Sequence, residues 1–130
     1  MSHLPLIAVV DDDPAMREAL ADLLEVLDFR CATFASAEAF VEAQATTLFD
    51  VLITDLNLVG KSGLDLQQRM RGLDPGLPVI LVSAQADPSI RSEVLRSGAL
   101  AYLVKPIDDT VLQRHLAAAL SRDRRGRTPQ

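Results

Sequence analysis

The sequence predicts an α/β fold in which a single doubly wound sheet of five parallel strands, in the order 2-1-3-4-5, is flanked by five helices. Two observations carry this prediction. Continuous apolar runs, typical of strands buried on both faces, alternate along the chain with segments whose apolar residues repeat at helical spacing. The connections between them are short, which implies right-handed crossovers and a parallel sheet covered by helices on both faces.

The individual elements are predicted from these patterns and from their end signals. The expected strands are residues 6–10, 30–34, 51–54, 79–82 and 100–104. The expected helices run from Pro14 to Leu27, from a cap near Ser36, from Leu64 to Met70, from Pro88 to Gly98, and from Asp108 or Asp109. Asp13-Pro14 and Asp87-Pro88 each provide an N-cap followed by a proline at the first helical position. Residues 57–63 are predicted as a loop.

The composition limits the class of protein. With 130 residues, 48% of them hydrophobic and 24% charged, the chain suits one globular domain and neither a disordered nor a fibrous protein. The net charge of -5 disfavours direct binding to nucleic acid or to an anionic membrane. No apolar stretch is long enough to span a membrane, and the first ten residues lack the basic region of a signal peptide. We therefore expect a soluble, cytoplasmic protein.

The domain boundary is expected near the C-terminus. Residues 4–120 carry all of the periodic segments and are predicted to form the folded domain. Residues 121–130 contain four arginines and no apolar periodicity, so they are interpreted as a basic linker or a disordered tail. The single cysteine, Cys31, cannot form an internal disulfide and is interpreted as a small buried hydrophobic residue.

Polar residues follow the predicted strands at the points where these end. Asp11 and Asp12 follow the first strand, Asp55 the third, Ser83 the fourth and Lys105 the fifth. In a doubly wound sheet, ligands bind at the carboxyl ends of the strands where the strand order reverses, here between the first and third strands. This placement brings three carboxylates side by side, and their repulsion calls for a hard divalent cation, best Mg²⁺, and for the ammonium of Lys105.

A metal held by carboxylates beside a lysine and a hydroxyl suits phosphoryl transfer, because both cations neutralise charge on the transferred group. Asp55 is then the candidate nucleophile, since carboxylates form aspartyl phosphates. Each of these residues alone is more often a helix cap, a strand-end hydroxyl or a surface charge. Their occurrence at four separate strand ends favours a site.

These residues resemble the receiver domains of two-component response regulators, which have a CheY-like fold, and specifically the FixJ-like group. The resemblance covers residues 4–120. It rests on the segments Val10 to Asp13, Leu52 to Leu56, Leu58 to Gly63, Val82 to Ala84 and Tyr102 to Pro106. In this family the corresponding residues form the acidic pocket, the phosphoacceptor, the loop after it, the switch hydroxyl, and the switch aromatic with its lysine.

The resemblance implies a role for each site residue. Asp55 would accept a phosphoryl group from a sensor histidine kinase, while Ser83 and Lys105 would contact the phosphoryl oxygens. Mg²⁺ would be bound directly by Asp12, Asp55 and the Asn57 carbonyl, and through water by Asp11. Asn57 and Gln85 would govern hydrolysis of the aspartyl phosphate. The Lys105-Pro106 peptide bond is expected to be cis.

The resemblance also implies an output. Phosphorylation would draw Ser83 toward the phosphoryl group and let Tyr102 swing inward from the surface. This would alter the face of the fourth helix, fifth strand and fifth helix. Because this face carries charges of both signs, which suit a self-complementary contact, we predict that phosphorylation drives homodimerisation through it. Either the protein works alone, or a DNA-binding output domain in a longer parent chain would link the switch to transcription regulation. Two departures are Val59, where the family usually has proline, and Ser83, where threonine is commoner.

Two other functions compete with this interpretation. A Mg²⁺-dependent phosphohydrolase with an aspartyl nucleophile would need a general acid, commonly two residues on, where Asn57 stands, and a substrate cap that is missing here. A dinucleotide binder would need glycines after the first strand, where the chain has Asp11 to Pro14. We therefore expect a signalling switch and no enzyme beyond self-phosphorylation and autodephosphorylation.

Overall fold

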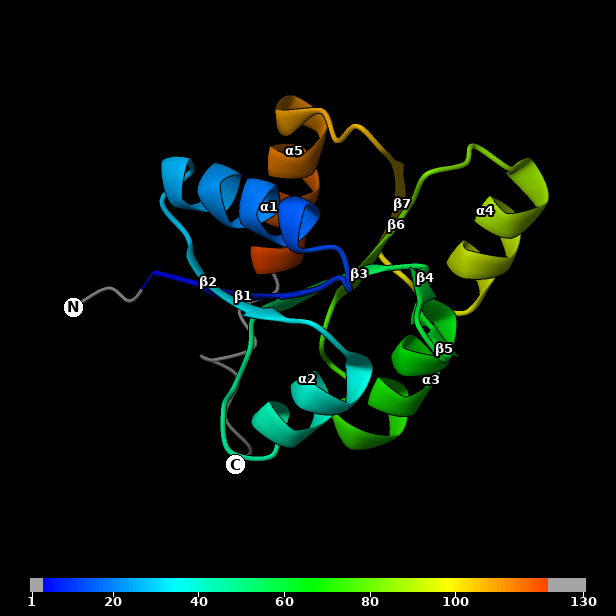
Figure 1. Ribbon diagram of the computed structural model, residues 1–130, viewed down its shortest axis with the longest axis horizontal. Coiled ribbons are helices and arrows are strands. Elements are labelled where there is room, and N and C mark those ends of the chain that lie inside the picture. The colour runs from blue at the N-terminus through cyan, green and yellow to red at the C-terminus, as the bar shows by residue number, and fades with distance from the viewer. Residues whose placement is uncertain (1–3, 122–130) are drawn as a thin grey trace.

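A five-stranded parallel sheet forms the centre of the molecule in the computed structural model, which describes residues 4–121 (Figure 1). Its strands are β1 (Leu6–Val10), β2 (Arg30–Phe34), β3 (Val51–Asp55), β6 (Val79–Ser83) and β7 (Ala101–Val104). They lie in the order β2-β1-β3-β6-β7, and every neighbouring pair is parallel. This order confirms the predicted arrangement, and it reverses between β1 and β3. Apart from Ser121, the predicted basic tail lies outside the described residues.

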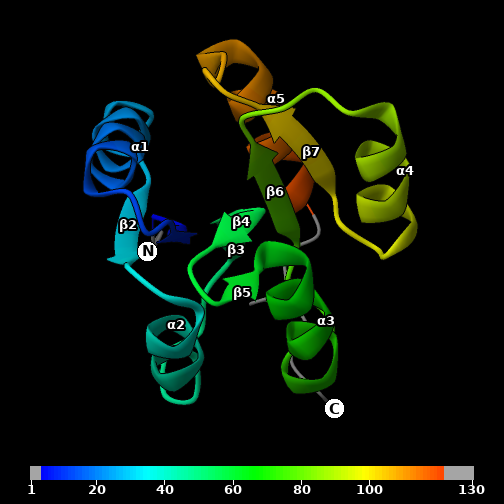
Figure 2. The ribbon, with the colours of Figure 1, turned by 45° about the vertical axis from the view of Figure 1, so that its right-hand side comes forward.

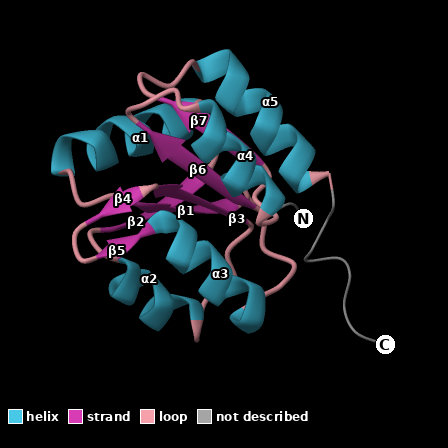
Figure 3. Cartoon of the chain, turned by 90° about the vertical axis from the view of Figure 1, so that its right-hand side faces the viewer, coloured by secondary structure: helices cyan, strands magenta, loops and turns pink. Residues whose placement is uncertain are grey.

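The helices are α1 (Pro14–Val26), α2 (Ala37–Gln44), α3 (Gly63–Leu73), α4 (Pro88–Arg96) and α5 (Asp109–Leu120). α1 and α5 cover one face of the sheet and α2 and α3 the other, as Figures 1 and 3 show. None of the helices among residues 4–121 combines the length and the apolar character needed to cross a membrane.

The strands are buried because each side of the sheet has its own hydrophobic core. Side chains alternate between the two faces of a strand. Ile7 and Val9 of β1 therefore pack with Leu24 of α1 and Leu116 of α5. Ala8 and Val10, which alternate with them along β1, belong to the second core. This core also contains Phe40 of α2, Leu66 and Met70 of α3, and Val94 of α4. The continuous apolar runs of the sequence reflect this burial on both faces.

The segment between β3 and α3 differs from the expected loop. It contains a short antiparallel hairpin of β4 (Asn57–Leu58) and β5 (Lys61–Ser62), which Figure 2 shows beside α3. The helix after it begins at Gly63, one residue earlier than predicted, because the Ser62 hydroxyl accepts a hydrogen bond from the Asp65 N–H and caps it. A Cβ atom on Gly63 would lie 2.2 Å from the Asp55 carbonyl oxygen, so glycine allows α3 to approach the end of β3.

A polar clamp joins the C-terminal end of α4 to α3. Gln67 of α3 is buried, and its side-chain amide donates to the Ser97 carbonyl oxygen at 3.0 Å. The Ser97 hydroxyl donates back to Gln67 Oε1 at 2.6 Å, and Arg71 donates to the same Ser97 carbonyl. At the other end of α4, Asp87 caps the helix by accepting from the N–H groups of Ser89 and Ile90. The two ends of α4 are thus held in different ways.

Candidate functional site

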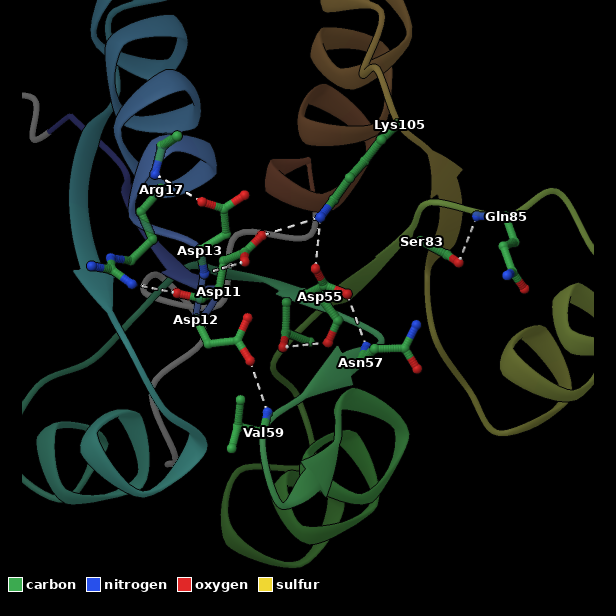
Figure 4. Close-up of polar contacts among 12 residues, drawn as sticks. Asp11, Asp12, Asp13, Arg17, Asp55, Asn57, Val59, Ser83, Gln85 and Lys105 are labelled. Carbon is green, nitrogen blue, oxygen red and sulfur yellow. Dashed lines mark hydrogen bonds and ion pairs between the residues drawn. The ribbon is translucent and has the colours of Figure 1, made fainter.

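The predicted site residues meet at the carboxyl edge of the sheet. Asp11 follows β1, Asp55 ends β3 and Ser83 ends β6, and all three residues are buried, with exposed fractions of 2%, 8% and 1%. Lys105 follows β7 and reaches across this edge toward the two carboxylates (Figure 4). The parallel sheet thus brings together residues up to 94 positions apart in the chain.

Lys105 pairs with both buried carboxylates. Its Nζ atom lies 2.6 Å from Asp55 Oδ2 and 3.4 Å from Asp11 Oδ2. Its backbone N–H donates to the Ser83 carbonyl oxygen, which continues the pairing of β6 with β7. The Lys105-Pro106 bond is cis, which confirms the expectation from the family resemblance. One ammonium therefore serves two carboxylates, and the cluster keeps a net negative charge.

Backbone N–H groups bind the remaining carboxylate oxygens. The Asn57 N–H donates to Asp55 Oδ1 at 2.8 Å, and the Asp13 N–H donates to Asp11 Oδ1 at 2.9 Å. Each buried carboxylate thus receives one hydrogen bond from the backbone and one from the lysine. These contacts reduce the cost of burying charge and fix the orientation of both side chains.

The burial of this cluster shifts two ionisation equilibria. Desolvation by burial raises the pKa of Asp11, and the nearby charge of Asp55 adds to this shift, while the Asp13 N–H and Lys105 oppose it. Partial burial lowers the pKa of Lys105, but its hydrogen bond with Asp55 and the charges of Asp11 and Asp55 outweigh this effect, so that the net shift is upward. Lys105 is therefore protonated at neutral pH.

Asp12 lies at the edge of this cluster and is half-buried. Its Oδ2 atom accepts a hydrogen bond from the Val59 N–H at 2.8 Å, so that its side chain reaches the turn between β4 and β5 (Figure 4). The structure therefore joins Asp11 and Asp55 through Lys105 and does not join Asp12 to them. Within residues 4–121, no group of three or more His, Cys, Asp or Glu side chains is arranged as a ready metal site.

The other side of Asp55 carries neutral groups. The Ser83 hydroxyl accepts a hydrogen bond from the Gln85 N–H at 3.1 Å, and the Tyr102 hydroxyl donates to the Gln85 carbonyl oxygen at 2.5 Å. Tyr102 is only 4% exposed. The expected starting position of this ring at the surface is therefore wrong for this structure, because the Gln85 carbonyl provides a partner that holds the ring inside. Asn57 and Gln85 are both exposed.

Two contacts of the site were missed by sequence reasoning. Arg17 of α1 donates from its guanidinium to the Asp11 carbonyl oxygen at 2.7 Å. Its position in the first turn after Asp13-Pro14 was the signal that could have placed it near the end of β1. The Val59 N–H gave no such signal, because every residue except proline carries this group.

Comparison with known proteins identifies the family. Residues 7–117 match the family model of the response regulator receiver domain. The chain belongs to this family. The receiver domain is 31% identical over 114 residues to the transcriptional regulatory protein FixJ of Bradyrhizobium diazoefficiens. This match covers 88% of this chain and 56% of that protein. It is 35% identical over 103 residues to the DNA-binding transcriptional regulator NtrC of Escherichia coli K12, covering 79% of this chain and 22% of that protein.

Solved structures agree with this assignment. Full-length FixJ from B. japonicum superposes on this receiver domain with a TM-score of 0.86 and 28% identity, covering 96% of this chain and 62% of that one. The BeF3-activated DrrB receiver domain superposes with a TM-score of 0.81 and 27% identity, covering 92% and 99% of the two chains. The chain spans about half or less of the curated relatives it matches. It is a receiver domain of the two-component response regulators, which are signalling proteins.

Proposed function

We propose that this receiver domain accepts a phosphoryl group on Asp55 from a sensor histidine kinase in the cytoplasm. The observation that carries the proposal is the environment of the Asp55 carboxylate. Its Oδ2 atom is bound by Lys105 Nζ at 2.6 Å and its Oδ1 atom by the Asn57 N–H at 2.8 Å, with Asp11 beside it. Asp55 is thus a buried, oriented carboxylate next to a cation that neutralises phosphoryl charge.

In the proposed transfer, a carboxylate oxygen of Asp55 forms a bond to the phosphorus of a phosphohistidine, and the bond between phosphorus and the imidazole nitrogen breaks. The electron pair of that bond returns to the imidazole. Lys105 then pairs with a phosphoryl oxygen in place of Asp55 Oδ2, and the Ser83 hydroxyl donates to another. No proton transfer to Asp55 is needed, because the carboxylate attacks in its ionised form.

The donor atoms at this edge fit Mg²⁺. Asp11, Asp12 and Asp55 supply hard carboxylate oxygens, and Mg²⁺ is typically held by one or two carboxylates with several waters. A single lysine also leaves the acidic cluster with a net negative charge, which a divalent cation would offset. Asp12, Asp55 and the Asn57 carbonyl would hold the ion directly, and Asp11 through water. When bound, Mg²⁺ would supply positive charge for the incoming phosphoryl group.

Ser83 would be the first residue to transmit phosphorylation of Asp55 to the surface of the domain. When its hydroxyl turns to a phosphoryl oxygen, it gives up its hydrogen bond with the Gln85 N–H, and the turn that also holds Tyr102 loses a contact. A pocket of about 150 Å³ lies next to this turn, lined by Tyr102 and by the start of α4. The face of α4, β7 and α5 also carries exposed charges of both signs: Arg91, Glu93, Arg96, Asp108, Asp109 and Arg114.

A self-complementary contact through this face would form a homodimer on phosphorylation, since charges of both signs can pair across a two-fold axis. A DNA-binding output domain in a longer parent chain would then be brought together in pairs. The lengths of FixJ and NtrC, of which this chain covers 56% and 22%, support such a parent chain.

The test of the phosphorylation site is an intact-mass measurement after incubation with acetyl phosphate, with Mg²⁺ and with a chelator. We expect one phosphoryl adduct on the unaltered protein, a much smaller yield in chelator, and none on Asp55→Asn. Asp65→Asn, which changes an exposed aspartate at the start of α3, is the matched control and should be phosphorylated normally. An adduct that persists on Asp55→Asn would contradict the assignment.

The same samples test the output. In sedimentation experiments, the protein should be a dimer with the phosphoryl mimic beryllofluoride and a monomer without it. Arg91→Glu should weaken this dimer without reducing phosphorylation. A monomer at all concentrations would rule out dimerisation and leave the phosphorylation site unaffected.

A further inference from the structure

A single backbone hydrogen bond joins two parts of the site that are far apart in sequence. Asp12, after β1, accepts from the Val59 N–H at 2.8 Å, and the two residues are 47 positions apart. Only Oδ2 of Asp12 takes part in this bond. In Figure 4 the other carboxylate oxygen lies on the side of Asp11 and Asp55. The bond therefore fixes Asp12 with one oxygen toward the hairpin and one toward the acidic cluster.

We infer that the Val59 N–H is a positioning group that orients Asp12 as a ligand for Mg²⁺. The inference rests on the proposed function, because it takes Mg²⁺ as the ion bound at this edge. Carboxylates that bind metals are usually held by hydrogen bonds from a second layer of groups, and loss of such a bond typically lowers metal affinity by about 10- to 100-fold. The Val59 N–H provides this support for Asp12.

The hairpin that carries Val59 is anchored well enough to serve this purpose. Val59 and Gly60 form the turn between the paired residues Leu58 and Lys61. Next to the hairpin, Gly63 packs against the Asp55 carbonyl oxygen, and its N–H donates to the Leu56 carbonyl at 2.7 Å. The position of the turn is thus set by the backbone around Asp55, so Asp12 is oriented relative to the phosphoacceptor itself.

The side chain of Val59 has no part in this role. It is 87% exposed, and only the backbone N–H points to Asp12. A change of side chain that keeps the N–H should therefore leave Asp12 in place. Proline is the one natural residue that removes the N–H.

The turn can accept proline at this position. Gly60 has a φ of +74°, and Asp28 is the only non-glycine residue with a positive φ among those described, so Val59 has a negative φ. A negative φ followed by a positive φ is the combination of signs found in a type II turn, which favours proline at its first central position. The residue before it, Leu58, is extended in β4, as the residue before a proline prefers. Val59→Pro therefore removes one hydrogen bond with little other change.

The test is a calorimetric titration of Mg²⁺ alone into the unphosphorylated full chain. We expect Val59→Pro to bind Mg²⁺ about tenfold more weakly than the unaltered protein. Val59→Ala, which keeps the N–H, should bind as the unaltered protein does. Equal affinity in the proline and alanine variants, or tighter binding by the proline variant, would overturn the inference.

A second measurement on the unaltered protein decides the matter if Val59→Pro does not fold. Binding effects are reciprocal, so an N–H that promotes Mg²⁺ binding must itself be held more firmly when Mg²⁺ is present. Hydrogen exchange of the Val59 amide should therefore slow on addition of Mg²⁺. An unchanged or faster exchange at saturating Mg²⁺ would overturn the inference.

Asp12→Asn separates this inference from the proposed function. If the unaltered protein does not bind Mg²⁺, or if Asp12→Asn binds it equally well, the proposed metal ligands are wrong. If Asp12→Asn weakens binding and Val59→Pro does not, the metal site stands and the positioning role of Val59 is wrong. Weakening by both variants, with Val59→Ala unchanged, supports both.

Discussion

The two sides of Asp55 are built in different ways. On one side, Asp11 and Lys105 form a charged half. In it, both carboxylate oxygens of Asp11 and both of Asp55 have a hydrogen-bond or ion-pair partner at 2.6 to 3.4 Å. On the other side, Asn57 and Gln85 form a neutral half whose residues are exposed. The charged half is fixed before any ligand arrives, which is what electrostatic stabilisation of a transferring group requires. The exposed side chains of the neutral half can turn toward a ligand.

Lys105→Met should break the charged half and give the largest effect. Without the ammonium, Asp11 and Asp55 repel each other and no lysine neutralises the phosphoryl oxygens. We expect the rate of phosphorylation by acetyl phosphate, followed by intact mass, to fall about a hundredfold. Arg69→Met removes the same charge from an exposed position of α3 and should leave the rate unchanged. Equal rates in the two variants would show that the lysine contacts are not needed for transfer.

Changes in the neutral half should act on the loss of the phosphoryl group and much less on its uptake. The amides of Asn57 and Gln85 are able to orient a water molecule toward the phosphorus, and neither is bulky enough to shield it, so we expect a short phosphoryl lifetime. Asn57→Met combined with Gln85→Leu should lengthen this lifetime several-fold, measured as decay of the mass adduct. Gln68→Leu, at an exposed position of α3, is the control. A lifetime unaltered by the double change would show that these amides do not govern hydrolysis.

The smallest effect is expected on stability. Because the pKa of Asp11 is raised in the folded protein, folding favours its protonated form, and stability falls as the pH rises from the ordinary aspartate pKa of about 3.8 through the raised pKa. Asp11→Asn removes this loss while its side-chain oxygen can still accept from the Asp13 N–H. We expect Asp11→Asn to have a higher free energy of unfolding than the unaltered protein at pH 7, and its stability to depend less on pH in the acid range.

Chemical denaturation followed by circular dichroism measures this effect, since the chain has no tryptophan. Asp13→Asn is the control, because asparagine is as good an N-cap as aspartate and Asp13 is exposed. A stability of Asp11→Asn that is below that of the unaltered protein at neutral pH would mean that the contact with Lys105 outweighs the cost of burial. If Asp11→Asn is more stable but is no longer phosphorylated, the charged half lowers the stability of the protein and is needed for its function.

The sequence was sufficient to predict the sheet and to predict that the site residues meet at one edge of it. Runs such as residues 51–54 are apolar because both faces of the strand are covered, and the strand-order rule then places Asp11 next to Asp55. The caps at Asp13, Ser36 and Asp87 were also predicted correctly, because each depends on a side chain that accepts from a nearby N–H. Local chemistry and strand burial are both visible in residue types.

The parts that could not be predicted depend on backbone groups or on long-range geometry. Two-residue strands such as β4 and β5 are too short to show periodicity, so the hairpin was interpreted as a loop. The contact of Asp12 with Val59 involves an N–H that nearly every residue has. The burial of Tyr102 depends on the carbonyl of Gln85, whose direction is set by the turn after β6. None of these features leaves a signal in the residue types alone.

The clamp of Gln67 and Ser97 fixes the C-terminal end of α4 to α3. The helix has nine residues and is therefore about 13 Å long. If α4 tilted about Ser97, its Pro88 end, which follows Ser83 in the chain, would move most, and the junction with α3 would stay in place. A protein that binds near Pro88 would therefore sense such a tilt, whereas one that binds near Ser97 would meet the same surface in either position.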